Sequence, residues 1–128
     1  MNILLWVLQV ILGVYFIYTG ILHFTLPPGL PAQIAWMYEL PRGLHIFSGI
    51  AEILAGLGLI LPGLTKIQTR LTSLAALGLV FMMIGAAVWH FSRNEVPNIV
   101  MVLVLAALCG FVAYGRWKMN PLKTRANP

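Results

Sequence analysis

The sequence has no aspartate, a single cysteine and few charges of either sign. Charged residues make up 9% of its 128 residues, with three acidic side chains against eight basic ones. A soluble domain carries roughly a quarter charged residues, so this chain lacks the polar cover that would keep it dissolved. Together with a hydrophobic content of 60%, this composition predicts an integral membrane protein with one domain over residues 1–128.

These absences also exclude several kinds of chemistry. The lone Cys109 cannot form an internal disulfide and no CxxC motif exists, which argues against thiol–disulfide chemistry on this chain alone. We interpret Cys109 as a small packing residue. The sequence shows no Ser-His-Asp set, phosphate-cradling glycine loop or carboxylate pair, so we do not expect catalysis by the chain on its own. The basic residues flank apolar runs, which indicates membrane topology and not nucleic acid binding.

Four apolar runs follow one another along the chain, each close to the ~20 residues that cross a bilayer as a helix. Their bounds are 3–26, 43–64, 71–92 and 96–117, and we expect Pro62–Gly63 to close the second. Glycines recur seven residues apart in the first three runs, at Gly13, Gly20, Gly49, Gly56, Gly63, Gly78 and Gly85. A period of seven returns to one helix face, and small residues there allow backbones to approach. The pattern predicts an all-α, left-handed four-helix bundle.

The basic residues predict the orientation of this bundle. Six of the eight basic residues lie in the 65–70 connection and in the C-terminal segment, and the other two connections hold one arginine each. The tail of the C-terminal segment is residues 118–128. The positive-inside rule places both termini and the 65–70 connection in the cytoplasm, with the protein in the cytoplasmic (inner) membrane.

The connection between the first two runs contains "PAQIAWMYELPR", in which Trp36 and Tyr38 are aromatics that favour membrane interfaces. We expect a short helix at the outer membrane surface. An ordinary loop with two interfacial anchors fits the same residues.

Glu52 is an acid within an apolar run. It lies nine residues past Gly43, or roughly 13 Å along a helix, which places it near the middle of the membrane. His45 is seven residues earlier and shares its helix face, as does Ser48. An intramembrane acid that is ionised and alone costs several kcal/mol, so Glu52 should be neutral or paired.

The predicted topology gathers three histidines in the outer half of the bundle. His23, with Thr19 beside it, is near the outer end of the first helix, and His90 is near the outer end of the third. Three interpretations stay open: a packing hydrogen bond, the polar end of a pocket for a quinone, sterol or other lipophilic ligand, or a metal or haem site. No HExxH or paired-histidine spacing exists, so we assign no metal. The candidate ligand-binding residues are Glu52, His23, His45, His90, Thr19 and Ser48.

Three segments resemble the DoxX-like family of small four-helix integral membrane proteins: "YTGILHFTLP", "FSGIAEILAGLGLILPG" and "AALGLVFMMIGAAVWH". The resemblance implies a bundle in the cytoplasmic membrane and matches Glu52 and His23 to the family's polar positions. Some members are subunits of quinone-linked sulfur-oxidising enzymes, and others join membrane oxidoreductase complexes.

From these observations we expect an accessory subunit of a redox-linked membrane complex, with an outward-opening pocket around Glu52. The alternatives are a quinone-reactive oxidoreductase subunit and a membrane-protein assembly chaperone. The expected partners are the lipid bilayer and either another membrane protein or further copies of the chain. No cofactor is assigned beyond a quinone or similar lipophilic ligand.

Overall fold

The computed structural model of the protein describes residues 1–32 and 34–123, and this part of the chain consists of helices and their connections. The last five residues of the expected tail, 124–128, lie outside it. The helices are α1 (Asn2–Thr25), the 3-10 helix η1 (Ala35–Glu39), α2 (Arg42–Thr65), α3 (Arg70–Ser92), α4 (Val96–Tyr114) and a π-helical turn η2 (Gly115–Met119). The four predicted membrane helices are confirmed, and no bound differs by more than three residues. The largest difference is at the end of the fourth run, which becomes η2.

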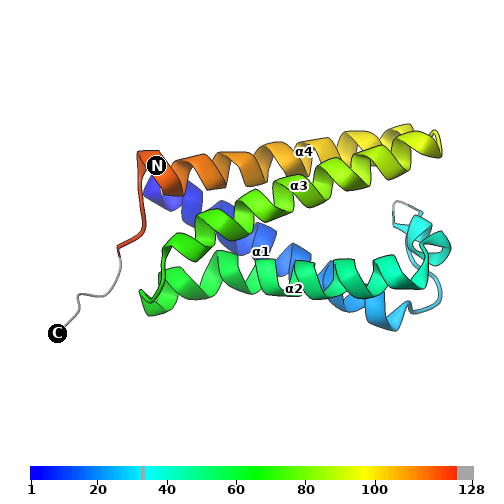
Figure 1. Ribbon diagram of the computed structural model, residues 1–128, viewed down its shortest axis with the longest axis horizontal. Helices are drawn as coiled ribbons and strands as arrows, with labels where there is room; N and C mark the ends of the chain where they lie inside the picture. The colour runs from blue at the N-terminus through cyan, green and yellow to red at the C-terminus, as the bar shows by residue number, and fades with distance from the viewer. Residues whose placement is uncertain (33, 124–128) are drawn as a thin grey trace.

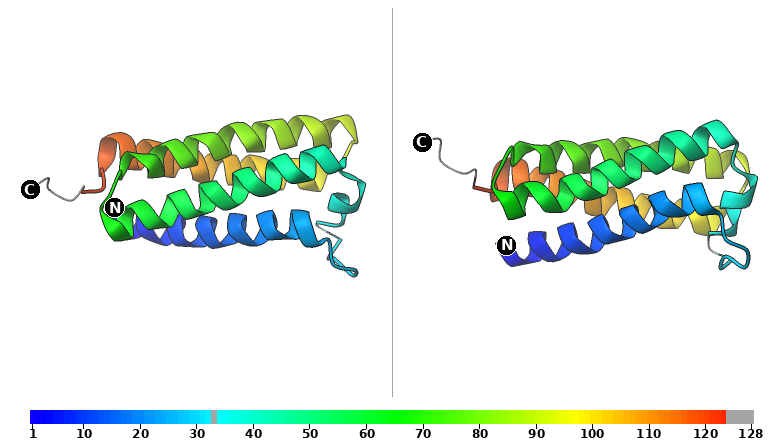
Figure 2. Two further views of the ribbon diagram at one scale, coloured as in Figure 1. Left: turned by 60° about the horizontal axis from the view of Figure 1, so that its bottom comes forward. Right: turned by 90° about the horizontal axis from the view of Figure 1, so that it is seen from below.

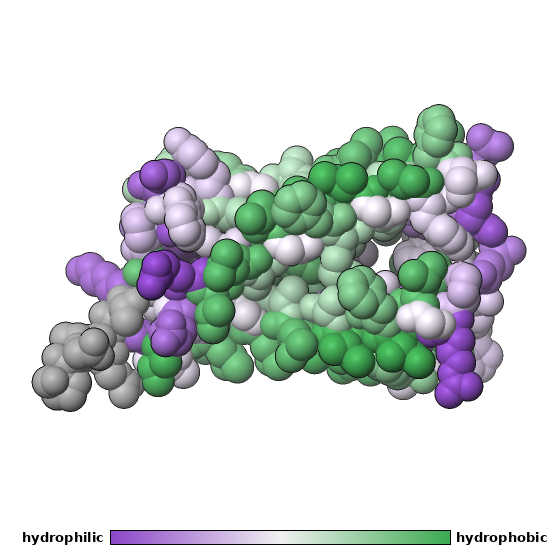
Figure 3. Space-filling view, in the orientation of Figure 1, coloured by the Kyte–Doolittle hydropathy of each residue, from purple (hydrophilic) through white to green (hydrophobic). Residues whose placement is uncertain are grey.

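The helices form a bundle in which each runs antiparallel to the next along the chain (Figures 1 and 2). The N-terminus, the α2–α3 connection and the described segment that follows α4 lie at one end, which we call the termini end. The η1 helix and the α3–α4 connection lie at the other, the η1 end. All four long helices are long and apolar enough to cross a membrane. A hydrophobic band lies between two more polar ends (Figure 3), so the chain is a multi-pass membrane protein. Its orientation, the identity of the membrane and the handedness of the bundle remain predictions.

The glycine repeat explains the close packing of α1 on α2. A Cβ atom on Gly56 would lie 2.7 Å from the carbonyl oxygen of Gly13, and one on Gly20 would lie 2.9 Å from that of Gly49. Backbone cannot move aside as a side chain can, so these positions require glycine. The predicted helix contact is confirmed for this pair.

The same interpretation is wrong for α3. A Cβ atom on Gly78 or Gly85 would meet nothing within 4 Å among the described residues. Both glycines instead line a cavity, because α3 stands away from α1 and α2 toward the η1 end.

Pro62 does not close the second helix as expected. Helix α2 continues to Thr65 and ends at Lys66, which adopts the left-handed conformation with φ 60°. Proline has no N–H to give to the carbonyl of Gly58 one turn earlier. The hydroxyl of Thr72 on α3 donates to that oxygen at 2.9 Å, so a neighbouring helix satisfies the carbonyl that Pro62 leaves open.

The packed core lies toward the termini end. Leu5, Leu12, Leu59, Leu79, Cys109 and Val112 are fully buried or nearly so. Cys109 is therefore the packing residue that the sequence predicts.

The short helix expected between the first two membrane helices is confirmed as η1. Its Met37 is buried, and the Tyr38 hydroxyl donates to the Pro27 carbonyl and accepts from the Leu30 amide at 3.2 Å. These contacts fasten the connection across the end of the bundle. Its position at a membrane surface remains a prediction.

Candidate functional site

A cavity of about 740 Å³ occupies the η1 end between the α1–α2 pair and the α3–α4 pair. Its wall is mostly apolar and includes Phe16, Phe47, Phe81, Met82, Met83 and Leu105. Of these, Phe47 on α2 and Phe81 on α3 are 64% and 66% exposed. The cavity therefore opens sideways between α2 and α3, where Figure 3 shows a hollow in the hydrophobic band. The sequence predicts an outward-opening pocket, and this direction stays a prediction with the orientation of the bundle. At the η1 end, η1 contributes Trp36 and Met37 to the cavity wall.

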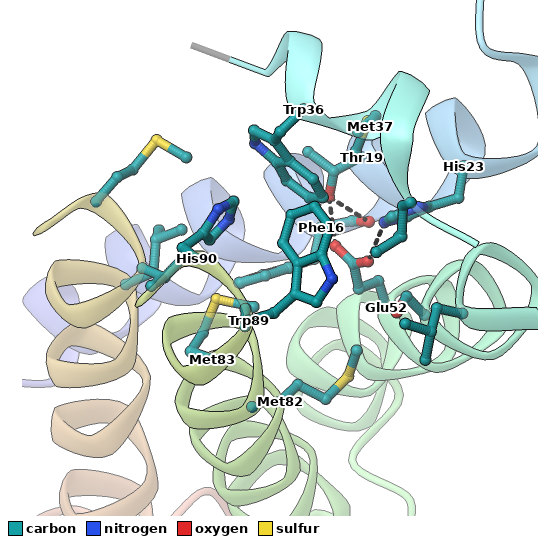
Figure 4. A pocket seen from close by; sticks show the side chains of 18 of the residues that line it. Phe16, Thr19, His23, Trp36, Met37, Glu52, Met82, Met83, Trp89 and His90 are labelled. Carbon is teal, nitrogen blue, oxygen red and sulfur yellow. Dashed lines mark hydrogen bonds and ion pairs between the residues drawn. The ribbon is translucent and has the colours of Figure 1, made fainter. Parts of the chain in front are cut away.

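Glu52 is 6% exposed and lies at the cavity wall with both carboxylate oxygens paired. The Thr19 hydroxyl donates to its Oε1 at 2.7 Å, and Nε2 of His23 lies 2.8 Å from its Oε2 (Figure 4). The prediction that this acid is neutral or paired is thus met by pairing. Thr19 and His23 are four residues apart, so one face of α1 presents both to α2.

His45 extends this arrangement by one residue. Its Nδ1 lies 2.8 Å from Nδ1 of His23, and both rings are buried. A hydrogen bond between two ring nitrogens needs one donor and one acceptor, so a single proton lies between them. Thr19, Glu52, His23 and His45 form a continuous hydrogen-bonded row, which we call the Glu52 chain. It runs from the cavity toward the η1 end, where α2 begins.

His90 reaches the same end of the bundle but does not join the Glu52 chain. Its Nδ1 lies 2.9 Å from Oε1 of Glu95. The ring of Trp36 lies edge-on to His90, with centroids 4.8 Å apart, and is 6.3 Å from the ring of His23. An indole ring therefore lies between the two histidines. The sequence predicts that His23, His45 and His90 lie in the same half of the bundle. In the structure, only His23 and His45 are in contact with each other.

Two buried nitrogen atoms at the cavity have no hydrogen-bond partner among the described residues: Nε1 of Trp36 and Nε2 of His90. Nδ1 of His90 faces a carboxylate, and in the tautomer that donates from Nδ1 to Glu95 the Nε2 atom is an acceptor. The indole N–H is a donor. A buried polar group without a partner is costly, so this pair is suited to a ligand that offers both an acceptor and a donor.

Trp36 is the site residue that sequence reasoning missed, because an aromatic between two prolines is typical of an interfacial anchor. Ser48 lines the cavity wall, and its predicted role in ligand binding stays a prediction. No sequence signal separates a tryptophan that turns into the bundle from one that turns toward headgroups.

An ionic network closes the η1 end above the cavity. Arg93 contacts Glu39, which ends η1, and its Nε donates to Oε1 of Glu95 at 3.2 Å. The hydrogen bond from His90, with Arg93 beside it, holds the pKa of Glu95 below its usual range. Arg93 thus links the α1–α2 connection to the α3–α4 connection.

The described residues contain no group of three or more histidine, cysteine or acidic side chains placed to hold a metal ion. Both ring nitrogens of His23 are already engaged, with Glu52 and with His45. The expectation that the protein carries no stoichiometric metal or haem remains a prediction for measurement.

Comparison with known proteins gives one finding. The sequence profile of the DoxX-like family matches residues 7–112, which extend from the first turns of α1 to near the end of α4. No curated protein and no solved structure matches the chain at a significant level.

Proposed function

Because the chain belongs to the DoxX-like family of membrane proteins, we propose that it is an accessory subunit of a redox-linked membrane complex and that its cavity binds a lipophilic ligand with a polar head. The observation that carries the proposal is Glu52, a fully paired acid within a membrane helix at the wall of a large apolar cavity. Intramembrane acids that face a cavity are typical of functional sites.

The cavity fits such a ligand in shape and in chemistry. Its side opening between α2 and α3 meets the hydrocarbon region, so a lipid-soluble molecule can enter without crossing water. Phe47, Phe81 and Met82 provide apolar contact for the body of the ligand. Volumes of 300–1,000 Å³ with few polar groups are typical of small-molecule sites.

Each polar residue would have a separate task. Nε1 of Trp36 would donate to a carbonyl or hydroxyl of the head, and Nε2 of His90 would accept from a hydroxyl. His23 holds the carboxylate of Glu52 in place, and Thr19 holds the second oxygen. Glu52 would therefore set the orientation of the head by its charge without being exposed to water.

The test is lipid extraction and mass spectrometry on the purified chain and two variants. Glu52→Leu removes the acid and should abolish retention of the co-purified ligand. Glu52→Gln keeps the shape and should fold normally with reduced retention. An unchanged ligand content in Glu52→Leu would leave Glu52 as a packing residue and end the proposal.

A variant that fills the cavity tests whether the ligand occupies this space, independently of the chemistry of Glu52. Gly78→Leu introduces a side chain at a wall position where a Cβ meets nothing within 4 Å. It should displace the ligand while Glu52 stays intact. Ile84→Phe is the matched control, because Ile84 is exposed on the same helix and does not line the cavity.

The role as an accessory subunit is tested separately. Crosslinking in the native membrane followed by mild solubilisation should recover the chain with a larger membrane-associated oxidoreductase. Recovery of the chain alone, at native expression level, would contradict this part of the proposal and leave the ligand site standing.

A specific observation favours a second candidate, a quinone-reactive subunit. The Glu52 chain joins groups that can each hold a proton, from Glu52 at the cavity through His23 to His45 near the η1 end. A bound quinone would supply a carrier of electrons and protons, with the electrons exchanged by a partner protein. The protein's own residues would hold the head of the quinone and move protons between Glu52 and the η1 end.

This candidate predicts a ubiquinone or menaquinone in the extracted lipid. It further predicts that His45→Phe leaves quinone content unchanged but slows quinone turnover in the assembled complex. Turnover equal to wild type in His45→Phe would remove the proton route. The assembly-chaperone alternative gains no support, because Glu52 is enclosed and paired within the chain and is not offered to a client helix.

A further inference from the structure

The termini end contains a buried cation that the proposed function does not use. Arg116, in η2, is 4% exposed. Its Nε donates to Oε1 of Gln9 at 2.6 Å, and its Nη1 donates to Oδ1 of Asn2 at 2.8 Å and to the carbonyl of Asn120 at 2.9 Å. Its Nη2 makes one longer contact, 3.4 Å to the Asn2 carbonyl. Every one of these partners is neutral.

No carboxylate side chain balances this charge. The sequence has three acidic residues, and Glu39, Glu52 and Glu95 all belong to the η1 end or to the middle of α2. A buried guanidinium without a counter-ion is unfavourable even when its N–H groups are bonded, since neutral dipoles offset only part of the lost hydration. Among residues 1–32 and 34–123, none at the end that buries Arg116 carries a negatively charged side chain.

A second cavity, of about 250 Å³, lies beside Arg116. It is formed where the α2–α3 connection meets the segment after α4, two regions that Figure 1 places together. Arg70 at the start of α3 brings a second positive charge to its wall. The remaining lining residues are Thr69, Ser73, Trp117, Pro121 and Leu122, and none is acidic.

Ser73 adds a hydroxyl to the same wall. The residue is 5% exposed and lines the cavity beside Arg70 and Arg116. Hydroxyl and guanidinium donors that converge on one small space are the combination that recognises phosphate oxygens.

We propose that this second cavity binds a phosphate ester anion through Arg116, Arg70 and Ser73. The expected source is the headgroup of an anionic phospholipid, because the cavity lies at the ends of membrane-spanning helices, where headgroups lie. The volume accommodates a phosphate group and not a whole lipid, so the acyl chains would extend along the helices beside the half-exposed Trp117. A soluble phosphate ester offers the same chemistry. The proposal goes beyond the ligand site at the η1 end and shares no residue with it.

The experiment uses the full chain in a neutral detergent. Short-chain phosphatidylglycerol, short-chain phosphatidylcholine and inorganic phosphate are titrated separately, and thermal stability and bound lipid by native mass spectrometry are recorded. Phosphatidylglycerol should bind at about one molecule per chain and raise the melting temperature. Phosphatidylcholine should bind at least about fivefold more weakly, since it offers the same phosphate with a compensating positive charge.

Arg70→Gln and Ser73→Ala are the test variants, because Arg70 is exposed and neither supports the Arg116 network. Each should weaken phosphatidylglycerol binding at least about fivefold, the scale of one lost charge-assisted hydrogen bond. Lys66→Gln is the matched control. It removes the same charge from the same connection but does not line the cavity, so binding should change less than about twofold.

The outcomes are distinct. Equal losses in Arg70→Gln and Lys66→Gln would mean diffuse attraction to a basic surface and would overturn the site, as would the absence of any response to the three probes. Inorganic phosphate that stabilises the protein as well as phosphatidylglycerol, and fails to do so in Arg70→Gln, would support the site and assign it to soluble phosphate esters.

Discussion

The contact between α1 and α2 and the cavity side of α3 use glycine and space in opposite ways. Between α1 and α2, glycines lie against glycines, and backbone oxygens stand within 3 Å of any added Cβ. On α3, the heptad glycines Gly78 and Gly85 have open space before them and line the cavity. The same sequence repeat therefore marks a closed helix contact in one place and the wall of a binding cavity in the other. The repeat indicates where small residues are tolerated, and the neighbouring helix decides what the space contains.

The largest effect should come from adding one methyl group to the closed side. Gly56→Ala places a Cβ 2.7 Å from the Gly13 carbonyl oxygen, so α1 and α2 must separate. We expect a loss of about 2–3 kcal/mol in the free energy of unfolding, measured by denaturant titration in mixed micelles.

Gly78→Ala is the matched change on the open side. It meets no neighbour, and alanine favours a helix over glycine, so stability should rise by up to about 1 kcal/mol. Equal losses in the free energy of unfolding of Gly56→Ala and Gly78→Ala would mean that Gly78 is packed as closely as Gly56. The difference between the closed and the open side would then not exist.

The next effect concerns Glu52. Glu52→Leu leaves Thr19 and His23 facing an apolar side chain, and should lower the free energy of unfolding by about 1–3 kcal/mol. Glu52→Gln should lose on the order of 1 kcal/mol at most, because His23 can adopt the other tautomer and accept from the new amide. Thermal unfolding of the two variants beside wild type checks this order, and a larger loss in Glu52→Gln would mean that the charge itself is required for folding.

A smaller effect on stability, with a clear effect on binding, is expected at Trp36. Trp36→Phe keeps an aromatic ring against His90 and Trp89 but removes the N–H that has no partner among the described residues. Stability should change by less than about 1 kcal/mol, while ligand retention measured by lipid extraction should fall. Undiminished retention would mean that the indole N–H is not a contact of the ligand.

The smallest effect is the pH dependence of the ionic network at the η1 end. The pKa of Glu95 is held below its usual range by the hydrogen bond from His90, so the stabilisation is present above the unfolded-state value of about 4.3. It is lost as the pH falls through the lower, folded-state pKa. As the pH is lowered from 5, the melting temperature of Glu95→Gln should fall less steeply than that of the wild type. An identical decline in both proteins would exclude Glu95 as its source.

Much of the fold could be predicted from the sequence. Each apolar run has the length of a bilayer crossing, and charges and prolines separate the runs, so the four helices were placed to within a few residues. Pro62 was misread because the helix tolerates it near its end, where Thr72 donates to the carbonyl that proline leaves free. That donor is ten residues away along the chain and on another helix, and no local pattern announces it.

The candidate site could be predicted only in part. Glu52 stands out because an acid is rare among apolar residues, and a heptad spacing correctly put His45 on its face. The actual partners Thr19 and His23 come from another helix, 33 and 29 positions earlier in the sequence. Trp36 and Arg116 were not identified, because an aromatic or basic residue near a helix end is normally explained by the membrane interface.

The sequence by itself determined that this is a four-helix membrane protein of the DoxX-like family with one conspicuous acid in its second helix. Only the tertiary structure decided which groups meet that acid, where the cavity opens and which glycines face space. The physical reason is that lipid-facing and core-facing surfaces of a membrane helix are equally apolar, so hydrophobic periodicity carries little information about how each helix is rotated. That rotation is set by packing between helices, and it places Thr19, His23, His45 and Glu52 in one hydrogen-bonded row while Arg116 is buried at the opposite end.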